Sequence, residues 1–227
     1  MYHLTPADFA DTGQWRLVIQ IRIDGLEAWL ENTLHKEIPR QGLCDVKWER
    51  TDSGLLEKLE SAVYDNPRLL DDFATRIILF DKKTIFVPSF ILEESLNSEE
   101  EIYNKVYKGR VSDIFSEKEG EITALWTMAP GVKSFLLRTF PGARISSHLM
   151  QEVITLRKRN KGNQATLFII QGINEADFIL MKGQQLLSAS SHTCETEDIP
   201  SMIDTICEGY GLQKSDITVV KENPTEE

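Results

Sequence analysis

The sequence predicts an α/β protein with mixed sheets, built from two similar lobes. The stretch VIQIRIDGLEAWL at residues 18–30 has the pattern of a strand, a tight turn and a second strand. A similar hairpin pattern returns as LFIIQGINEADFILMKG at residues 167–183. A third strand, a helix and a fourth strand are predicted after each hairpin. The order strand-strand-strand-helix-strand therefore occurs twice, which predicts an internal duplication.

The first lobe opens with alternating side chains. Residues 15–23 alternate apolar and polar positions, which is the period of a strand with one buried face, and an Asp-Gly pair then predicts a type I′ turn with positive φ angles. The return strand is expected to run to about Glu31, and CDVKWER at residues 44–50 supplies a third strand. Ser53 is placed to cap a helix. The apolar stripe of that helix consists of Leu55, Leu56, Leu59, Ala62 and Val63.

The middle of the chain contains shorter elements. The apolar run at residues 75–80 predicts a buried strand, and TIFVP at residues 84–88 predicts another, followed by helical sequence from Ser89. SEKEGE at residues 116–121 is interpreted as a polar joint. We then expect the strand ITALWTMA and the helix PGVKSFLLRTFPG, with Val132, Phe135, Leu136 and Phe140 on its buried stripe.

The segment at residues 145–162 has helical spacing in Ile145, Leu149 and Val153, although its Ile, Val and Thr residues also fit a strand. We prefer a helix. The chain is accordingly divided into a first lobe at residues 1–120, a connecting strand and helices at 121–163, and a second lobe at 164–227.

The second lobe repeats the order of the first. Strands are predicted at residues 165–172, 176–183 and 185–192, with turns near Asn174-Glu175 and at Gly183-Gln184. A helix over residues 197–208 is expected to stop at Gly209, and DITVV forms a last strand. Only KENPTEE follows, whereas the first lobe continues into a fifth strand and a helix, so the second lobe is expected to be shorter or incomplete.

Composition limits the function classes. The formal net charge of −11 opposes non-specific attraction to nucleic acid or to an anionic membrane. The first residues lack a basic start followed by an apolar run, and 18 uncharged apolar residues never occur together, so we expect a cytoplasmic protein without membrane insertion. The three cysteines, Cys44, Cys194 and Cys207, lack the close pairs of zinc sites, so neither a disulfide framework nor a structural metal is expected.

Three features resemble a known superfamily. They are TIFVPSF at residues 84–90, ALWTMAPGVKSFLLRTFPGA at residues 124–143 and the nearby His148, which all lie between residues 84 and 148. Together with the two-lobed order, they resemble the actin-like ATPases, a superfamily that includes sugar kinases and PilM-type pilus assembly proteins. The resemblance is closest to a bacterial family of unknown function assigned to that superfamily, and it implies an actin-like ATPase (ribonuclease H-like) fold.

The resemblance directs attention to the first hairpin of each lobe. In actin-like ATPases this hairpin carries a DxG-type loop that holds phosphates, while its acid positions magnesium or a water. The corresponding candidates are Asp24 and Gly25 in the first lobe, and Asn174 and Glu175 in the second. A phosphate cradle needs closely spaced glycines, because only they let several amide groups approach the anion. The first hairpin lacks the intervening residue and the second has no glycine at its turn. Because Asp-Gly hairpins are common for turn reasons alone, a structural role is favoured over nucleotide contact for Asp24 and Gly25.

Two histidines and one basic run remain as candidates. His148 starts a helix that would join the lobes and could act as an acid, a base or a ligand, but a hydrogen-bonded histidine at an inter-lobe contact is the favoured interpretation. His192 and Cys194 are close in sequence but lack an identifiable third ligand or orienting acid. The basic residues Arg157, Lys158, Arg159 and Lys161 fit a solvated helix end or a contact with an acidic or phosphate-bearing partner. RNA binding is not favoured, because no aromatic residue interleaves the run.

These observations predict a non-catalytic scaffold that binds a protein partner or a small ligand and needs neither cofactor nor metal. The alternative is a divergent ATP-binding enzyme or switch that uses ATP and magnesium. The absence of two glycine-rich acidic loops favours the scaffold.

Overall fold

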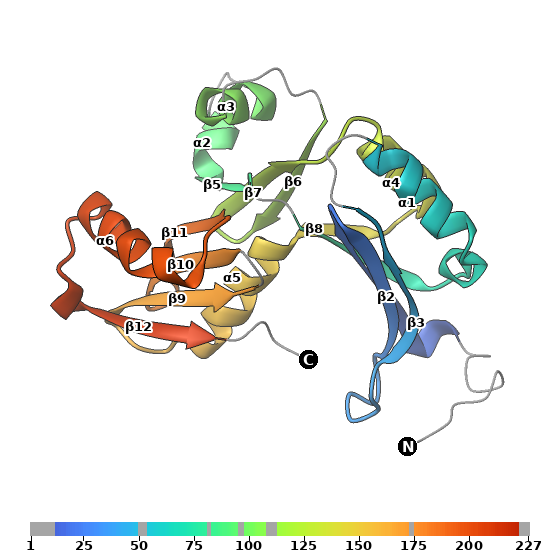
Figure 1. Cartoon of the computed structure of the whole chain (residues 1–227), viewed down its shortest axis with the longest axis horizontal. Coiled ribbons are helices and arrows are strands. Elements are labelled where there is room, and N and C mark those ends of the chain that lie inside the picture. Colours follow the sequence, from blue (N-terminus) through green and yellow to red (C-terminus); the bar gives the residue numbers. More distant parts are fainter. Residues whose placement is uncertain are drawn as a thin grey trace. The chain divides into compact units, whose positions relative to one another are not determined.

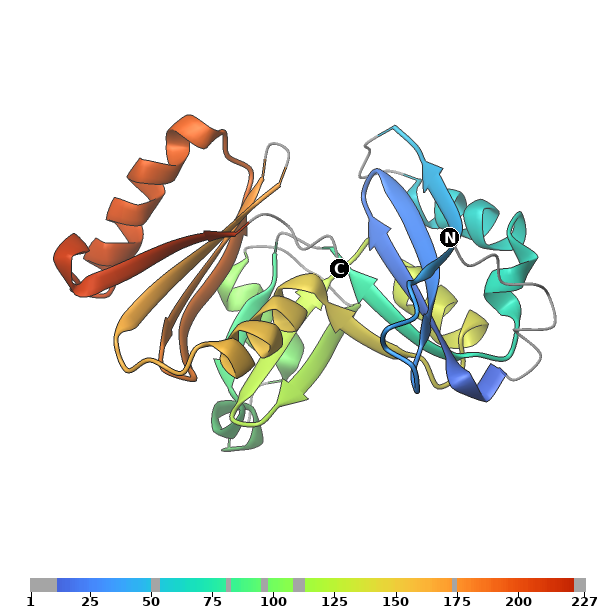
Figure 2. The same ribbon diagram turned by 90° about the horizontal axis from the view of Figure 1, so that it is seen from below.

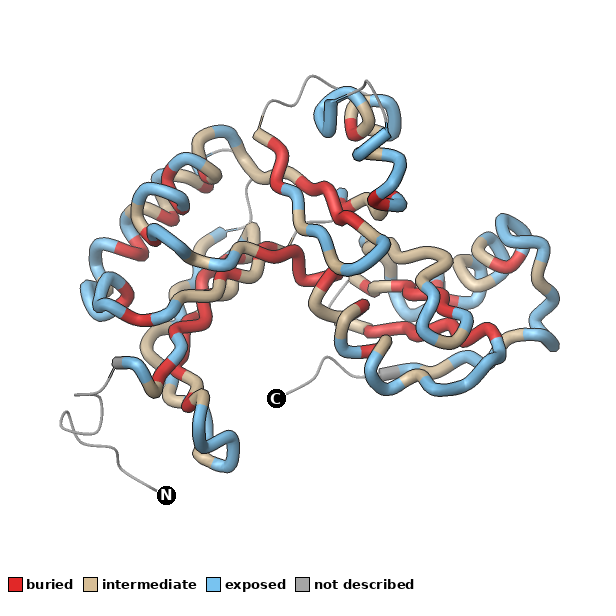
Figure 3. Tube along the Cα trace, turned by 180° about the vertical axis from the view of Figure 1, so that it is seen from behind, coloured by how far each residue is buried: buried red, intermediate tan, exposed pale blue. Residues whose placement is uncertain are grey.

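A computed structural model describes residues 12–49, 54–80, 83–94, 98–107, 113–172 and 175–222 of the 227-residue chain. The chain divides into two compact units, which are described separately. The first unit comprises residues 1–80, 110–117 and 127–147, and the second comprises 81–109, 118–126 and 148–227. In both units the buried positions follow the strands, whereas the helices alternate buried and exposed positions (Figure 3).

A five-stranded mixed sheet forms the centre of the first unit, in the order β3-β2-β1-β4-β8. β2 is antiparallel to both β1 and β3, and β4 is parallel to both β1 and β8. The helices α1 (Leu55–Tyr64) and α4 (Val132–Thr139) lie together on one face of this sheet (Figure 1). The strands are β1 (Trp15–Arg22), β2 (Gly25–Asn32), β3 (Gln41–Lys47), β4 (Ala74–Leu79) and β8 (Arg144–Ser147), preceded by the 3-10 turn Thr12–Gln14.

The core of the first unit follows the predicted stripes. Leu17, Ile19 and Ile21 alternate along β1 and are fully buried, because every second side chain of a strand points to the same face. α1 contributes Leu55, Leu59, Ala62 and Val63, and the predicted stripe of α4 is confirmed by the burial of Val132, Phe135, Leu136 and Phe140. A short 3-10 helix at Pro67–Leu70 follows α1, since proline interrupts the longer helix there.

A three-stranded sheet has the order β5-β7-β6. Its strands are β5 (Ile85–Pro88), β6 (Ile114–Glu119) and β7 (Ile122–Thr127). The helices α2 (Ser89–Glu94) and α3 (Glu99–Val106) follow β5. α3 begins with a capping box, in which Glu101 N donates to Ser98 Oγ and Ser98 N donates to the Glu101 carboxylate.

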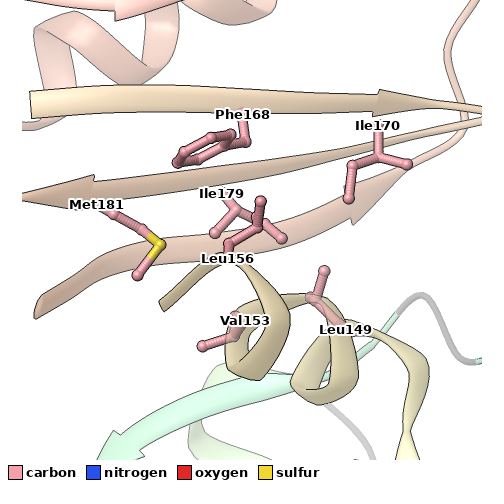
Figure 4. Packing of buried hydrophobic residues seen from close by; sticks show 7 residues of the cluster. All are labelled: Leu149, Val153, Leu156, Phe168, Ile170, Ile179 and Met181. Carbon is pink, nitrogen blue, oxygen red and sulfur yellow. The ribbon is translucent and has the colours of Figure 1, made fainter. Parts of the chain in front are cut away.

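The second unit contains a four-stranded sheet in the order β11-β10-β9-β12. The elements are β9 (Ala165–Gln171), β10 (Ala176–Lys182), β11 (Gln185–His192), β12 (Ile217–Glu222), α5 (His148–Arg159) and α6 (Ile199–Gly209). One face packs against α5 through Leu149, Val153 and Leu156, which point toward Phe168, Ile170, Ile179 and Met181 (Figure 4). The opposite face packs against α6 around Ile199. Because both faces are covered, β9 and β10 are apolar almost throughout.

The predicted order of elements is confirmed in both units. β1 pairs antiparallel with β2 and parallel with β4, and β9 pairs antiparallel with β10 and parallel with β12. In each sheet the third strand lies outside the second, and the strand that follows the helix lies on the other side of the first. The two sheets therefore share one order over four strands, and the first sheet has β8 as a fifth strand.

Two predicted elements were wrong. Residues 144–147 form the strand β8 and not the start of a helix, because they pair in parallel with β4, and the helix begins only at His148. The supposed polar joint at residues 116–121 contains most of β6 and its turn to β7, in which Gly120 has a φ of 61°. β6 is the end strand of its sheet, so charged side chains are tolerated there and hide the strand pattern.

Smaller differences concern the ends of elements. The third strand spans Gln41–Lys47 rather than residues 44–50. α6 ends at Gly209, as predicted, and two residues later Gly211 has a φ of 63°, while Leu212 N closes the helix end by donating to Cys207 O at 2.9 Å. Ser53, the predicted cap of α1, lies outside the described residues, and Gly54 occupies the cap position.

Candidate functional site

The first hairpin turn consists of Ile23 and Asp24, not of Asp24 and Gly25 as predicted. Gly25 is already the first residue of β2, pairs with Arg22 and does not have a positive φ. It is required for a different reason, because a Cβ at this position would lie 2.7 Å from the carbonyl oxygen of Val46 on β3. Gly25 therefore permits the close approach of a neighbouring strand.

Trp48 fixes the carbonyl groups of this turn. Its backbone N–H donates to Asp24 O at 3.0 Å, and its indole Nε1 donates to Ile23 O at 2.9 Å. Both turn carbonyls are thus held by the chain that follows β3. The residues after Asp24 are Gly25, Leu26 and Glu27, which bring no small hydroxyl side chain to the turn.

The second hairpin closes through a backbone hydrogen bond from Gly172 N to Glu175 O at 2.8 Å. Asn174 lies outside the described residues. The prediction that no glycine occurs at this turn was wrong, because Gly172 is its first residue. A Cβ on Gly172 would lie 3.2 Å from Glu175 Cγ and 3.8 Å from Glu175 Oε1. The acidic side chain therefore lies against the glycine at the point where a phosphate would need exposed amides.

His148 belongs to a buried polar cluster of the second unit. At the start of α5, it is 8% exposed, and its Nε2 lies 3.4 Å from Asp177 Oδ1 on β10. The same carboxylate oxygen accepts a hydrogen bond from Ser191 Oγ on β11 at 2.5 Å. Asp177 and Ser191 are directly opposite each other in the β10–β11 ladder, so both side chains point to the face covered by α5.

This cluster does not have the arrangement of an activated nucleophile. In such an arrangement the histidine lies between the hydroxyl and the acid, so that it can take the hydroxyl proton. Here Asp177 lies between Ser191 and His148. Asp177 gives Ser191 Oγ and His148 Nε2 a partner and thereby orients His148, which belongs to the same unit.

His192 lies on the other face of the same strands. Its Nε2 is 2.9 Å from Ser190 Oγ, and its ring meets Phe178 edge-on with 5.9 Å between the centroids. Burial lowers the pKa of His192 from its ordinary value of 6.5, and the charge of Asp177 opposes this shift. Asp177 points away from the Phe178 face, because neighbouring residues of a strand alternate, so it does not orient His192. Cys194 packs at the margin of the apolar cluster under α6.

The basic run lies at the end of α5. Lys158, Arg159 and Lys161 are exposed, whereas Arg157 is half-buried. The side chain of Asn160, inside the run, donates to Gly183 O at 2.8 Å and thereby joins the helix end to the β10–β11 turn. The partner-binding role of the four basic residues stays a prediction.

Two residues of the polar cluster, Asp177 and Ser191, were not identified from the sequence. The signal for Asp177 is an acid in an otherwise apolar strand, ADFILMK, whose other interior positions are buried. All three cysteines have free thiols. No group of three or more His, Cys, Asp or Glu side chains among the described residues could hold a metal ion, and no described helix is long and apolar enough to cross a membrane.

Comparison with solved structures identifies the fold. A Bacteroides thetaiotaomicron protein with an actin-like ATPase fold and unknown function matches with a TM-score of 0.78 and 19% identity, over 97% of this chain and 86% of that one. The cytoplasmic domain of EpsL from the type II secretion system of Vibrio cholerae matches at a TM-score of 0.42 with 12% identity, over 93% and 83% of the two chains. A PilM–PilN type IV pilus biogenesis complex matches at 0.40 with 13% identity, over 87% and 66%.

The first of these matches shows that the chain has the actin-like ATPase fold, as the resemblance in its sequence implied. At 19% identity, this match shows the fold alone. No curated protein matches the chain significantly. A family profile matches residues 6–218, nearly the whole chain. The protein therefore belongs to the family described as Protein of unknown function (DUF3822).

Proposed function

We propose that the protein is a non-catalytic scaffold of actin-like ATPase fold that binds a protein partner and does not use ATP. The position of Glu175 carries this proposal. Its carboxylate lies against Gly172 in the second hairpin, where the superfamily would place a phosphate. A carboxylate about 4 Å from a phosphate charge costs roughly 1 kcal/mol even in bulk water and more in a partly buried site.

The first hairpin supports the same proposal. Phosphoryl transfer depends almost wholly on positioned hydrogen-bond donors and metal ions around the phosphates. In this hairpin the glycine accommodates Val46, and the turn carbonyls accept hydrogen bonds from Trp48. These contacts give Asp24 and Gly25 a role in packing β3.

Titration calorimetry with Mg-ATP and a phosphate-release assay test the proposal. We expect no hydrolysis and a Kd no tighter than roughly 1 mM, which corresponds to about 4 kcal/mol of binding free energy. Glu175→Ser should tighten binding by about fivefold or more, because roughly 1 kcal/mol of repulsion is removed even with the screening of bulk water. Glu208→Ser, at an exposed position on α6, is the matched control and should have no effect.

Micromolar binding of Mg-ATP that is weakened by Asp24→Ala would contradict the proposal. That result would favour the alternative, a divergent ATP-binding enzyme or switch.

A further inference from the structure

A groove of about 470 Å³ lies in the first unit between the end of β3 and α1. Val46 and Trp48 line it from the strand side, and Ala62 lines it from the helix, which gives the groove an apolar floor. β3 and α1 lie beside each other in both views of the chain (Figures 1 and 2). The groove therefore lies between one strand of the five-stranded sheet and one helix of the same unit.

β3 is the edge strand of that sheet. Trp48 N donates to Asp24 O, and hydrogen-bonded pairs alternate along an antiparallel ladder, so the backbone groups of Val46 and Cys44 also face β2. The backbone groups of Asp45 and Lys47 consequently point away from the sheet, and both residues are exposed. An edge strand that presents its N–H and C=O groups in this way can pair with an added strand.

The charges around the groove favour a basic occupant. Of its two lysines, Lys47 Nζ forms an ion pair with Asp45 Oδ1 at 2.8 Å, whereas Lys58 Nζ donates to the uncharged backbone carbonyl Glu49 O at 3.1 Å and keeps its positive charge. Glu57 and Asp65 line the helix side of the groove, and neither forms an ion pair among the described residues. Counted with Asp45 on β3, three carboxylates stand against two lysines, and this local excess of one negative charge agrees in sign with the net charge of −11.

We propose that β3 and this groove bind an extended, basic peptide segment of a partner protein, a proposal that rests on the scaffold function. The segment adds a strand to β3 through the outward backbone groups of Asp45 and Lys47. One apolar side chain enters the groove over Val46 and Ala62. The side chain two positions along lies about 7 Å away on the same face, and a Lys or Arg there reaches Glu57 and Asp65.

The probe is a fluorescein-labelled decapeptide, TVTKTVTKTV, which places Val and Lys on one face of an extended strand. Its control, TVTETVTETV, replaces the lysines by glutamates. Fluorescence anisotropy with the full chain should show saturable binding of the lysine peptide and at least tenfold weaker binding of the glutamate peptide. Hydrogen exchange should show that the lysine peptide protects the amides of Asp45 and Lys47.

Two pairs of variants locate the site. Asp45→Pro removes the outward N–H together with the carboxylate and should abolish binding, whereas Asp45→Ala removes only the carboxylate, leaves Lys47 unpaired and should retain weakened binding. Glu57→Gln combined with Asp65→Asn should weaken binding about tenfold without touching the backbone of β3. Asp71→Asn combined with Asp72→Asn, at exposed positions outside the groove, is the control and should leave binding unchanged. Circular dichroism confirms that each variant is folded, and the carboxylate pair keeps the test decisive if the proline variant unfolds.

Equal binding of the two peptides, or no effect of the carboxylate variants, overturns the proposal. Absence of peptide binding together with a dimer that Asp45→Pro dissociates also overturns it and assigns the β3 edge to a second copy of this chain. The nucleotide assays are independent of this test. ATP hydrolysis with intact peptide binding would overturn the scaffold function alone, and loss of peptide binding without nucleotide binding would overturn only the peptide site.

Discussion

At Gly25, the missing side chain makes room for a neighbouring strand. A Cβ there would lie 2.7 Å from Val46 O, which real Cβ atoms do not tolerate, so the backbone of β3 would have to move. At Gly42, on the partner strand, a Cβ would have no neighbour within 4 Å. The two glycines thus form a matched pair on adjacent strands, one required by packing and one not.

We expect Gly25→Ala to lower the free energy of unfolding by about 1–3 kcal/mol, the usual cost of forcing an extra carbon into a packed site. Gly42→Ala should be neutral or stabilising by up to about 1 kcal/mol, because alanine restricts the unfolded chain. Urea denaturation of both variants measures the difference. Equal stabilities of the two variants would mean that β3 shifts without cost to accommodate a methyl group at residue 25 of β2.

His192 links stability to pH. Burial lowers its pKa below 6.5 in the folded protein, so the unfolded chain binds more protons below about pH 6.5. The stability that comes from neutral His192 is fully present above pH 6.5 and is lost as pH falls through the lowered pKa. His192→Gln should therefore make the decline in unfolding free energy between pH 7.5 and pH 5 shallower. Denaturation midpoints across this range test the prediction, which is wrong if the two proteins show the same slope.

At the scale of elements, α5 combines a core-facing stripe with a basic end. Leu149, Val153 and Leu156 are fully buried against the sheet of the second unit. Arg157 follows Val153 by four residues, so it lies on nearly the same side of the helix, which explains why it is half-buried while Lys158 is exposed. The residues of the basic run therefore differ in burial.

We expect Arg157→Ser to lower the free energy of unfolding by about 1 kcal/mol, because the buried stem of the side chain loses its packing. Lys158→Ser should change the free energy of unfolding by about 0.5 kcal/mol or less, because exposed Lys158 contributes only a screened interaction with the helix dipole. Chemical denaturation of the two variants provides the comparison. If both variants lose the same free energy of unfolding, the side chain of Arg157 contributes no more packing than a solvated residue.

At the scale of the whole molecule, the two sheets have one strand order but different coverings. α1 and α4 lie on one face of the first sheet, whereas α5 and α6 pack on opposite faces of the second. The hairpins that open the sheets also differ, since one accommodates Val46 and the other holds Glu175 against Gly172. A shared fold therefore coexists with two hairpins whose described residues make different contacts.

Thermal unfolding gives a whole-molecule measure of the nucleotide proposal. With about 5 mM Mg-ATP and a Kd of about 1 mM or weaker, mass action adds at most about 1 kcal/mol of stability. For a chain of this size the corresponding rise in Tm is no more than about 4 °C. A larger rise would show that Mg-ATP binds the folded protein more tightly than the scaffold proposal allows.

The sequence by itself determined the repeated order strand-strand-strand-helix-strand and the apolar stripes, because these depend on periodicities within a short window. The alternation of β1 and the stripe of α4 are examples, and both were predicted correctly. Only the tertiary structure decided which distant residues meet. His148 and Asp177 are 29 positions apart and come together because α5 crosses the β10–β11 ladder. β8 is a strand because β4 offers it a partner, despite helical spacing in its own sequence. Gly25 is required by Val46, a contact 21 residues away in the chain, and not by the turn beside it. Such contacts depend on packing between segments, which local patterns do not encode.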